Sequence, residues 1–182
     1  MAALLVTSAC STDATRGEPN YLIGAGMADI TGPIVDVGFT GYSQPTHIAN
    51  GVHTRLNARA FIIGELDEGP RLVYVVADLL NVSHELRLEV VDNLKAEYGD
   101  TYSLDNVVLS ATHTHSSPGG YRHDNALRQA YFDAVVAGIT DAIVAAHESL
   151  QPGTISIGQR DVDEAGANRS LVAYEQNPED ER

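Results

Sequence analysis

The stretch NVVLSATHTHSSPGG, residues 106–120, decides how this chain is organised. Its apolar run, 107–109, predicts a buried strand, and a polar Ser-Pro-Gly-Gly turn closes the stretch. Chemistry in α/β folds commonly lies where a buried strand gives way to a polar, glycine-bearing loop. Side chains at i and i+2 of an extended segment point the same way, so His113 and His115 are expected to face one site if the extension continues beyond the strand. Because neutral imidazole is a common zinc ligand, the pair favours metal or catalytic use over a plain polar loop with two surface histidines.

Composition bounds the possible functions. The chain has 182 residues, which fits one domain or part of one, and 43% are hydrophobic, enough to build a core. The formal net charge of -14 argues against nucleic acid and anionic membrane surfaces as partners, and it is compatible with a neutral or cationic substrate. No uninterrupted apolar run approaches the roughly 18 residues of a membrane span. No obligate protein partner is expected.

The first 20 residues are read separately from the fold. Residues 1–9 are short, apolar and rich in small side chains, and they precede Cys10, the single cysteine, which excludes an internal disulfide. The segment resembles the end of a bacterial lipoprotein signal, in which the cysteine is lipidated. It therefore predicts a secreted, periplasmic or outer-surface lipoprotein of bacterial type. The alternative is an irregular N-terminus without such a role.

Four strands are expected outside the opening stretch. The pair Gly24 and Gly26 indicates close backbone packing in a strand rather than a dinucleotide motif, because the third glycine is missing. Asp78 ends a run that reads as a strand covered on both faces, and a structural role is favoured for it over a site role. Two of the strands should form a hairpin. The strands are expected at residues 21–30, 58–66, 71–79 and 154–158.

Two helices complete the predicted fold. A four-residue apolar repeat predicts a helix over 83–98, with Ser83 as N-cap and Gly99 ending it, and a second apolar stripe predicts a helix over 125–150. No closing helix or strand is expected in residues 166–182. The fold class is therefore α+β, a mixed sheet flanked by at least two helices. Three further histidines, on the helices or their ends, are expected at the surface: His84, His123 and His147.

A long segment without clear periodicity, residues 31–54, lies between the first two strands. Loops of this length in a compact domain are functional or mobile. Its GFTGY stretch, residues 38–42, could bring backbone N–H groups close to a ligand, because glycine allows a close approach.

Four separated blocks carry a family resemblance. They follow one another in order, and together they extend from residue 21 to residue 182. The chain resembles the N-terminal part of the neutral, non-lysosomal ceramidases. The blocks are IGAGMADITGP at 23–33, GVHTRLNARAF at 51–61, SATHTHSSPGGY at 110–121, and NRS at 168–170 with Tyr174 and Asn177-Pro178.

The resemblance implies a layered sandwich of sheets between helices and a zinc amidase that cleaves ceramide into sphingosine and a fatty acid, with zinc activating the attacking water. By the same match, His113 is the first zinc ligand and His115 lines the site near the substrate head group. Arg169 matches an arginine beside the reacting centre, where a guanidinium can steady oxyanion charge. Gly41 lies in the loop that resembles the head-group contact. The substrate or a lipid anchor would bring the protein close to membranes.

Two departures from the family are visible. Ser117 stands where the family has a glycine, which is expected to stiffen the loop without removing the ligand. The remaining zinc ligands and the active-site serine of the family have no counterpart up to Arg182. The chain is therefore expected to be a truncated catalytic domain over 21–182, inactive alone, with part of its sheet uncovered and a tendency to associate.

Other readings stay open. Amidohydrolase barrels also carry His-x-His after a strand, but the hairpin breaks their strand–helix rhythm. Metallo-β-lactamases want Asp-His soon after His115, where this chain has Ser-Ser-Pro. A non-catalytic surface lipoprotein that keeps the scaffold without the chemistry is the remaining alternative.

Overall fold

One mixed sheet carries the fold. The computed structural model describes residues 18–182 except 35, 68, 119–125 and 163–165. The five strands have the spatial order β4-β3-β2-β1-β5, in which β3 and β4 are parallel and the other neighbours are antiparallel. This arrangement confirms the α+β prediction. The strands are β1 (Tyr21–Asp29), β2 (Asn57–Gly64), β3 (Arg71–Ala77), β4 (Val107–Ala111) and β5 (Gln151–Gly153).

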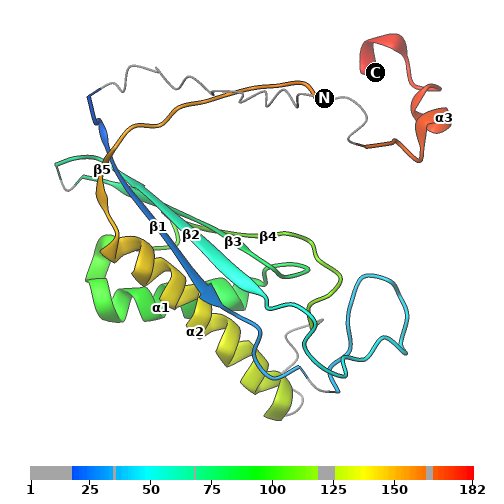
Figure 1. Ribbon diagram of the computed structural model, residues 1–182, viewed down its shortest axis with the longest axis horizontal. Coiled ribbons are helices and arrows are strands. Elements are labelled where there is room, and N and C mark those ends of the chain that lie inside the picture. The colour runs from blue at the N-terminus through cyan, green and yellow to red at the C-terminus, as the bar shows by residue number, and fades with distance from the viewer. Residues whose placement is uncertain (1–17, 35, 68, 119–125, 163–165) are drawn as a thin grey trace, which may run out of the picture.

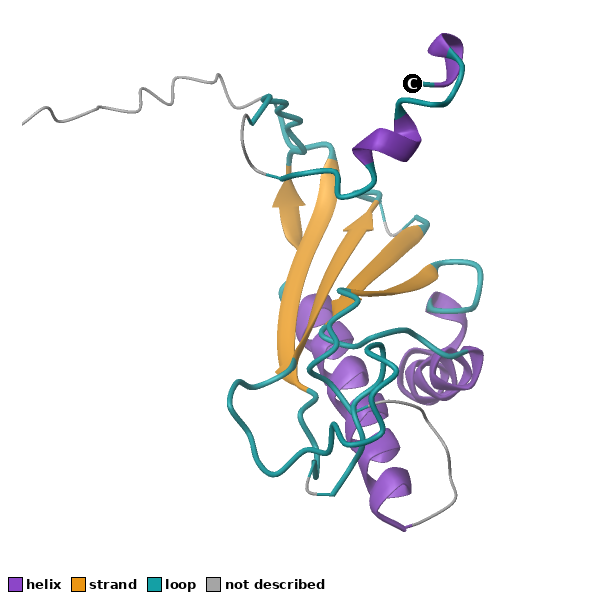
Figure 2. Ribbon diagram, turned by 90° about the vertical axis from the view of Figure 1, so that its right-hand side faces the viewer, coloured by secondary structure: helices purple, strands orange, loops and turns teal. Residues whose placement is uncertain are grey.

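Two long helices, α1 (His84–Tyr98) and α2 (Ala126–Glu148), cover one face of this sheet. Residues of β2 and β3 alternate between that face and the other, so that Ile62, Val73 and Val75 are completely buried under the helices. Full burial of each such side chain stabilises the fold by roughly 1.5–3 kcal/mol. Helix α2 contacts β1 and β2, and α1 packs beside it (Figure 2).

Helix α2 is long and apolar enough, by length and composition alone, to cross a membrane, with a mean hydropathy of 1.3. In the structure 56% of its most apolar window is buried against the rest of the protein. Its predicted apolar stripe, which includes Tyr131, Val135 and Ile139, faces the sheet. These contacts account for its apolar character as the main core helix.

Glycines let β1 and α2 approach closely. A Cβ added to Gly26 would overlap the carbonyl oxygen of Ala142, and one added to Gly24 would overlap that of Ala146. From the helix side, a Cβ on Gly138 would overlap the carbonyl oxygen of Asp29. The prediction that the glycine pair serves backbone packing is confirmed.

The other face of the sheet carries apolar side chains that no described residue covers completely. Phe61, Leu72 and Tyr74 are 45%, 45% and 43% exposed, and with Ile155 they line an open apolar groove of about 540 Å³. The prediction that the 71–79 strand is covered on both faces is therefore wrong for the described part of the chain. Its continuous apolar run gave no sign that alternate residues face outward. That the isolated chain associates stays a prediction.

Local signals placed the hairpin and α1 correctly. Strands β2 and β3 pair antiparallel through a turn at residues 65–70. The Ser83 side chain accepts a hydrogen bond from the N–H of Leu86 at 3.1 Å, and Gly99 ends α1 with a φ of 59°. A positive φ of this kind suits a residue without a Cβ.

The predicted strand over 154–158 is wrong. Strand β5 instead occupies Gln151–Gly153, which pairs with the start of β1 at the edge of the sheet. Pro152 fits there because an edge strand has one side without hydrogen-bonded neighbours. The alternation that suggested a strand continues outside the sheet, where Ile157 is 95% exposed.

The C-terminal segment after β5 is exposed, and only its first residues line the groove on the sheet. All described residues from 154 to 182 are exposed. The segment holds one helical turn, α3 (Leu171–Tyr174), and the short 3-10 helix η2 (Glu179–Glu181), where no helix was expected. Another 3-10 turn, η1 (Gly99–Thr101), follows α1. The lipoprotein interpretation of Cys10 lies outside the described residues.

His147 is half-buried, so the prediction that it lies at the surface is wrong. Its Nδ1 is 2.7 Å from the hydroxyl of the fully buried Tyr102, and its ring stacks on Tyr98 at 4.2 Å. The spacing along the chain does not reveal the two tyrosines as partners, because Tyr98 ends α1 and Tyr102 follows it, while His147 lies in the last turn of α2. His84 is exposed as predicted, and His123 lies outside the described residues.

We expect His147 to weaken the fold in acid. Burial, and then the nearby Arg71 guanidinium, hold the pKa of His147 below its ordinary value, with Glu97 and Glu148 acting weakly the other way. Below about pH 6.5 the unfolded chain therefore binds the extra proton more readily, and stability is lost as the pH falls through the folded-state pKa. Urea titrations at several pH values should show a smaller acid loss in His147→Gln than in the wild type. His84→Gln is the control, and its free energy of unfolding should depend on pH as that of the wild type does. The same pH dependence in all three proteins would contradict the assignment of the acid effect to His147.

Candidate active site

Because β3 and β4 are parallel, the segments that follow them, from Asp78 and from Thr112, begin at the same end of the sheet. Backbone pairing continues beyond both strands, because the N–H of Thr112 donates to the carbonyl of Ala77 at 3.0 Å and that of Thr114 to the carbonyl of Leu79 at 3.2 Å. The segment after β4 is thus held as an extension of the sheet. This geometry places the two histidines beside the end of β3.

His113 is oriented by the backbone of the neighbouring strand. Its Nδ1 lies 3.0 Å from the carbonyl oxygen of Leu80, and its φ is 60°. A carbonyl oxygen only accepts hydrogen bonds, so Nδ1 carries the hydrogen and Nε2 keeps its lone pair. Metal-ligating histidines commonly donate their other ring N–H to a carbonyl in this way. The exposed ring therefore offers Nε2 to a ligand.

His115 lies beside His113. The two ring centroids are 5.1 Å apart, and the ring planes meet at 73°. The ring of His115 is half-buried, and its Nδ1 is buried without a hydrogen-bond partner among the described residues. The structure thus brings the two predicted residues together but places them in different surroundings.

The loop over residues 31–54 closes over His115. Gly41, with a φ of 115°, lies directly against the imidazole, so that a Cβ there would overlap its ring atoms. The ring of Tyr42 meets that of His115 edge to face at 4.5 Å, and His47 lies 5.6 Å from Tyr42. A bridge between Phe39 and Pro118 ties this loop to the histidine loop. The structure therefore brings the predicted head-group residue Gly41 to the site.

A cavity of about 300 Å³ lies between the two loops. Its lining is mixed, with apolar side chains and several polar ones. It opens beside the histidine loop, since Ser116 and Pro118 form part of its wall. Other lining residues include Phe39, Ile48 and His53.

Ser117 has a structural use. It is 1% exposed, and its hydroxyl accepts a hydrogen bond from the N–H of Leu80 at 3.1 Å. The Leu80 peptide thus contacts Ser117 through its N–H and His113 through its carbonyl. This double contact fixes the loop against β3, as the stiffening prediction requires.

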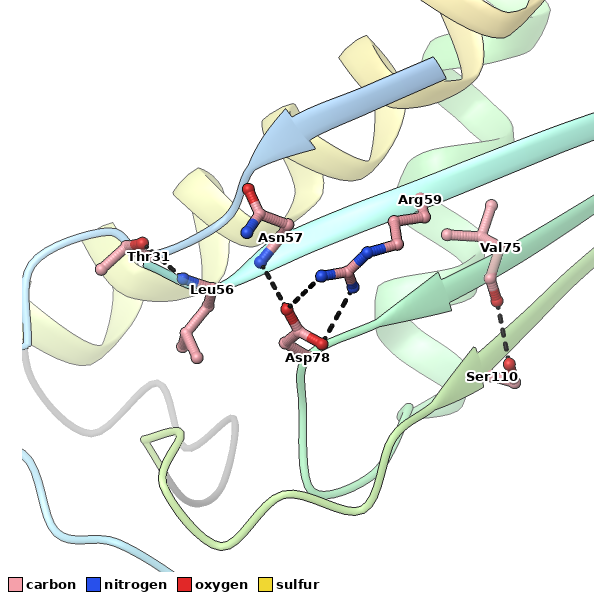
Figure 3. A network of polar contacts seen from close by, with 7 residues as sticks. All are labelled: Thr31, Leu56, Asn57, Arg59, Val75, Asp78 and Ser110. Carbon is pink, nitrogen blue, oxygen red and sulfur yellow. Dashed lines mark hydrogen bonds and ion pairs between the residues drawn. The ribbon is translucent and has the colours of Figure 1, made fainter. Parts of the chain in front are cut away.

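Asp78 ties the strand ends together beneath the site (Figure 3). Its carboxylate accepts hydrogen bonds from the N–H of Asn57 at 3.0 Å and from the Arg59 guanidinium at 3.0 and 3.2 Å. The hydroxyl of Ser110 donates to the carbonyl of Val75 at 3.0 Å and links β4 to β3 in the same view. The structural role favoured for Asp78 is confirmed, although its partners lie on β2 and not in the following loop.

Replacing Asp78 by alanine is expected to lower the free energy of unfolding by about 2 kcal/mol, because three hydrogen bonds to a carboxylate are lost. Asp78→Asn keeps an acceptor for the Asn57 N–H and should lose about half as much. Chemical denaturation at neutral pH measures both variants. A loss below about 0.5 kcal/mol for Asp78→Ala would show that the Asp78–Arg59 ion pair stabilises the fold no more than an ordinary surface salt bridge does.

Arg169 is not brought to the histidines. The segment that carries it is exposed and, in Figure 2, lies beyond the end of the sheet opposite the loops. Its role beside the reacting centre stays a prediction.

The side chains near the two histidines can be compared with the ligands of a zinc site. His113 fits a zinc ligand, because its free Nε2 and its bonded Nδ1 match the usual ligand arrangement. Among the described residues, however, no group of three or more His, Cys, Asp or Glu side chains is placed to hold a metal ion. A catalytic zinc usually has three protein ligands.

Comparison with known proteins identifies the family. The family model described as neutral/alkaline non-lysosomal ceramidase, N-terminal, matches residues 21–182. The chain belongs to this ceramidase family. Neutral ceramidase 1 of Arabidopsis thaliana is 45% identical over 170 residues, which make up 89% of this chain and 22% of the relative. Neutral ceramidase of Pseudomonas aeruginosa is 40% identical over 181 residues, or 96% of this chain and 27% of the relative.

Solved ceramidase structures share the fold. The crystal structure of neutral ceramidase from Pseudomonas aeruginosa matches with a TM-score of 0.80 and 41% identity, over 89% of this chain and 27% of that one. A structure described as ceramidase complexed with C2 matches with the same score and identity and covers 26% of that chain. This member of the ceramidase family thus spans about a quarter of the length of the relatives it matches.

Sequence reasoning missed several contacts at the candidate site. Leu80 was not expected there, because only the parallel pairing of β3 with β4 places its peptide beside His113. The ring contact of Tyr42 with His115 was likewise missed, although the segment 38–42 was singled out for its glycines. The signal that could have found Tyr42 is an aromatic residue directly after Gly41 in a loop already expected to contact a ligand.

Proposed function

We propose that this chain forms the N-terminal part of a zinc-dependent amidase that hydrolyses the amide bond of ceramide to sphingosine and a fatty acid. The observation that carries the proposal is the His113 ring, which is fixed by its Nδ1–H on the Leu80 carbonyl and offers Nε2 beside a second imidazole. The identity of 40–45% to proteins named neutral ceramidases supplies the substrate class.

The chain's own residues have distinct roles in this proposal. His113 holds the zinc through Nε2, and the Leu80 peptide keeps its ring in place. His115 and Gly41 meet the polar head group, next to the cavity between the two loops. Zinc supplies polarisation of a carbonyl oxygen and activation of water for attack.

Arg169 is proposed to steady negative charge on the reacting oxygen. This role requires the segment that carries Arg169 to pack against the histidine end of the sheet, because in the structure it lies beyond the other end (Figure 2). The planar guanidinium is central to the role, so Arg169→Lys should lower kcat more than it raises KM.

The experiment uses the longest polypeptide that the gene encodes. Calorimetric titration with zinc should give one tight site per chain, and release of fatty acid from a dispersed ceramide should require the metal. A chelator removes the activity, and zinc restores it. Absence of both tight zinc binding and hydrolysis would favour the alternative, a non-catalytic protein on the same scaffold. The lack of a third donor group among the described residues is the observation in its favour.

We further propose a secreted or surface location with lipid on Cys10, which would keep the site near membrane-derived ceramide. The sequence before Cys10 supports it. Incorporation of labelled palmitate into the wild type, and its absence in Cys10→Ser, tests the anchor; labelling of both would exclude it.

A further inference from the structure

The two histidines of the site differ in what their Nδ1 atoms meet. A neutral imidazole carries one N–H and one lone pair, and the groups around the ring decide which nitrogen holds the hydrogen. At His113, Nδ1 faces the Leu80 carbonyl at 3.0 Å and must carry the hydrogen. At His115, Nδ1 is buried and meets no acceptor among the described residues.

Two neighbouring residues, Gly41 and Tyr42, cover the His115 ring. The Gly41 backbone lies against the ring next to Nδ1 and leaves no room even for a methyl group. The ring of Tyr42 contacts the imidazole at 4.5 Å while 64% of Tyr42 is exposed, so this tyrosine is not a core residue. Together they keep water away from Nδ1.

We propose that Gly41 and Tyr42 fix His115 in the tautomer with its hydrogen on Nε2, opposite to the tautomer of His113, so that His115 donates a hydrogen bond to a substrate oxygen and is not a second zinc ligand. A hydrogen on the covered Nδ1 would be a buried N–H without an acceptor, which native structures rarely contain. With the hydrogen on Nε2, the only lone pair of the ring is the covered one, and no nitrogen remains to bind a metal.

This assignment gives the two histidines different roles at the site. His113 presents a lone pair, and its neighbour 5.1 Å away presents a hydrogen. A fixed donor suits a hydroxyl or carbonyl oxygen of the head group, or an oxygen on which charge develops. Tyr42 is a positioning residue, because it acts through His115, whereas Gly41 holds the ring and also meets the head group in the proposed function. The donor role rests on the proposed ceramide hydrolysis, whereas the tautomer does not.

Nitrogen NMR of the 182-residue chain tests the tautomer directly. With labelled histidine at about pH 8.5, where an ordinary imidazole is neutral, each ring nitrogen reports whether it carries a hydrogen. The signals that disappear in His115→Gln identify the residue. We expect hydrogen on Nε2 of His115 and on Nδ1 of His113. Hydrogen on Nδ1 of His115, or an averaged mixture of both forms, would overturn the proposal.

Matched variants distinguish the effect of Gly41 and Tyr42 on the His115 tautomer from the effect of any change in the same loop. Gly41→Ala and Tyr42→Ala should give mixed tautomers. Gly38→Ala, in the same loop but with only ordinary contact at 3.9 Å, and Tyr42→Phe, which keeps the ring, should not. Unchanged tautomers in both Gly41→Ala and Tyr42→Ala would refute the role of the cover.

Kinetics in the longest gene product tests the donor role. Tyr42→Ala should lower kcat/KM roughly 10²-fold, as expected when a reacting group is displaced by about 1 Å, with one zinc still bound per chain. Loss of zinc from His115→Gln would make His115 a ligand and refute the donor role. Absence of hydrolysis by the wild type would instead overturn the proposed function and leave the NMR result to decide the tautomer.

Discussion

Replacing His113 by alanine is expected to abolish tight zinc binding and to reduce ceramide hydrolysis by the longest gene product by more than about 10²-fold. Loss of an outer hydrogen-bond partner of a metal ligand alone costs 10–100-fold, and loss of the ligand should exceed that. Titration calorimetry and fatty-acid release measure the two effects. The large effect is expected because His113 is held ready for a ligand by the Leu80 carbonyl.

His84→Ala is the matched control for this substitution. His84 is an exposed histidine in the first turn of α1, and none of the hydrogen bonds or ring contacts of the described site histidines involves it, so zinc binding and activity should remain at the wild-type level. A His113→Ala variant that binds zinc as tightly as the wild type would contradict the ligand assignment. Circular dichroism of both variants checks that the fold is retained.

Replacing Gly26 by valine is expected to destabilise the protein by about 3 kcal/mol, at the upper end of ordinary overpacking. A side chain there would overlap the backbone of α2 at Ala142 and Ala146, and a helix backbone cannot move aside as a flexible side chain can. The helix must therefore separate from β1. The midpoint of urea unfolding measures the change.

Ala25→Val provides the matched control. Ala25 precedes Gly26 in β1 but points to the exposed face of the sheet, opposite Phe61 on β2. A β-branched side chain suits a strand at such a position, so the change in stability should stay within about 0.5 kcal/mol. Equal losses for Gly26→Val and Ala25→Val would show that the close β1–α2 contact is not the cause.

The fold was largely predictable because its signals are local. Ser83 and Gly99 mark the ends of α1 through backbone chemistry that depends on a few neighbouring residues. The failures concern long-range pairing. The alternation after Gly153 resembles a strand, but a strand forms only where a partner edge is available, and β1 begins at Tyr21, the residue paired with Gly153. His147 was misplaced for the same reason, since its tyrosine partners lie about 45 residues earlier in the chain.

The site was predictable to the extent that it follows from spacing. The close spacing of His113 and His115 placed them together, although the φ of 60° at His113 interrupts the extended backbone that the i, i+2 rule assumes, and the glycines of the long loop pointed to Gly41. Their different surroundings could not be predicted, because the Leu80 carbonyl and the Tyr42 ring reach the histidines only through tertiary contacts. Arg169 illustrates the limit of motif matching, which assigns a role to a residue without placing it near its partners.

The hydrogen bond between His113 and Leu80 joins the segment that follows β4 to the start of the crossover that carries α1. Opening of α1 together with the segment before it would free Leu80 and release the ring. A ligand held by His113 must therefore also oppose that opening, since binding to the closed form lowers the population of the open one. Amide protons of α1, far from the ligand, should then exchange with solvent more slowly in its presence, so that α1 would report occupancy of a site it does not touch.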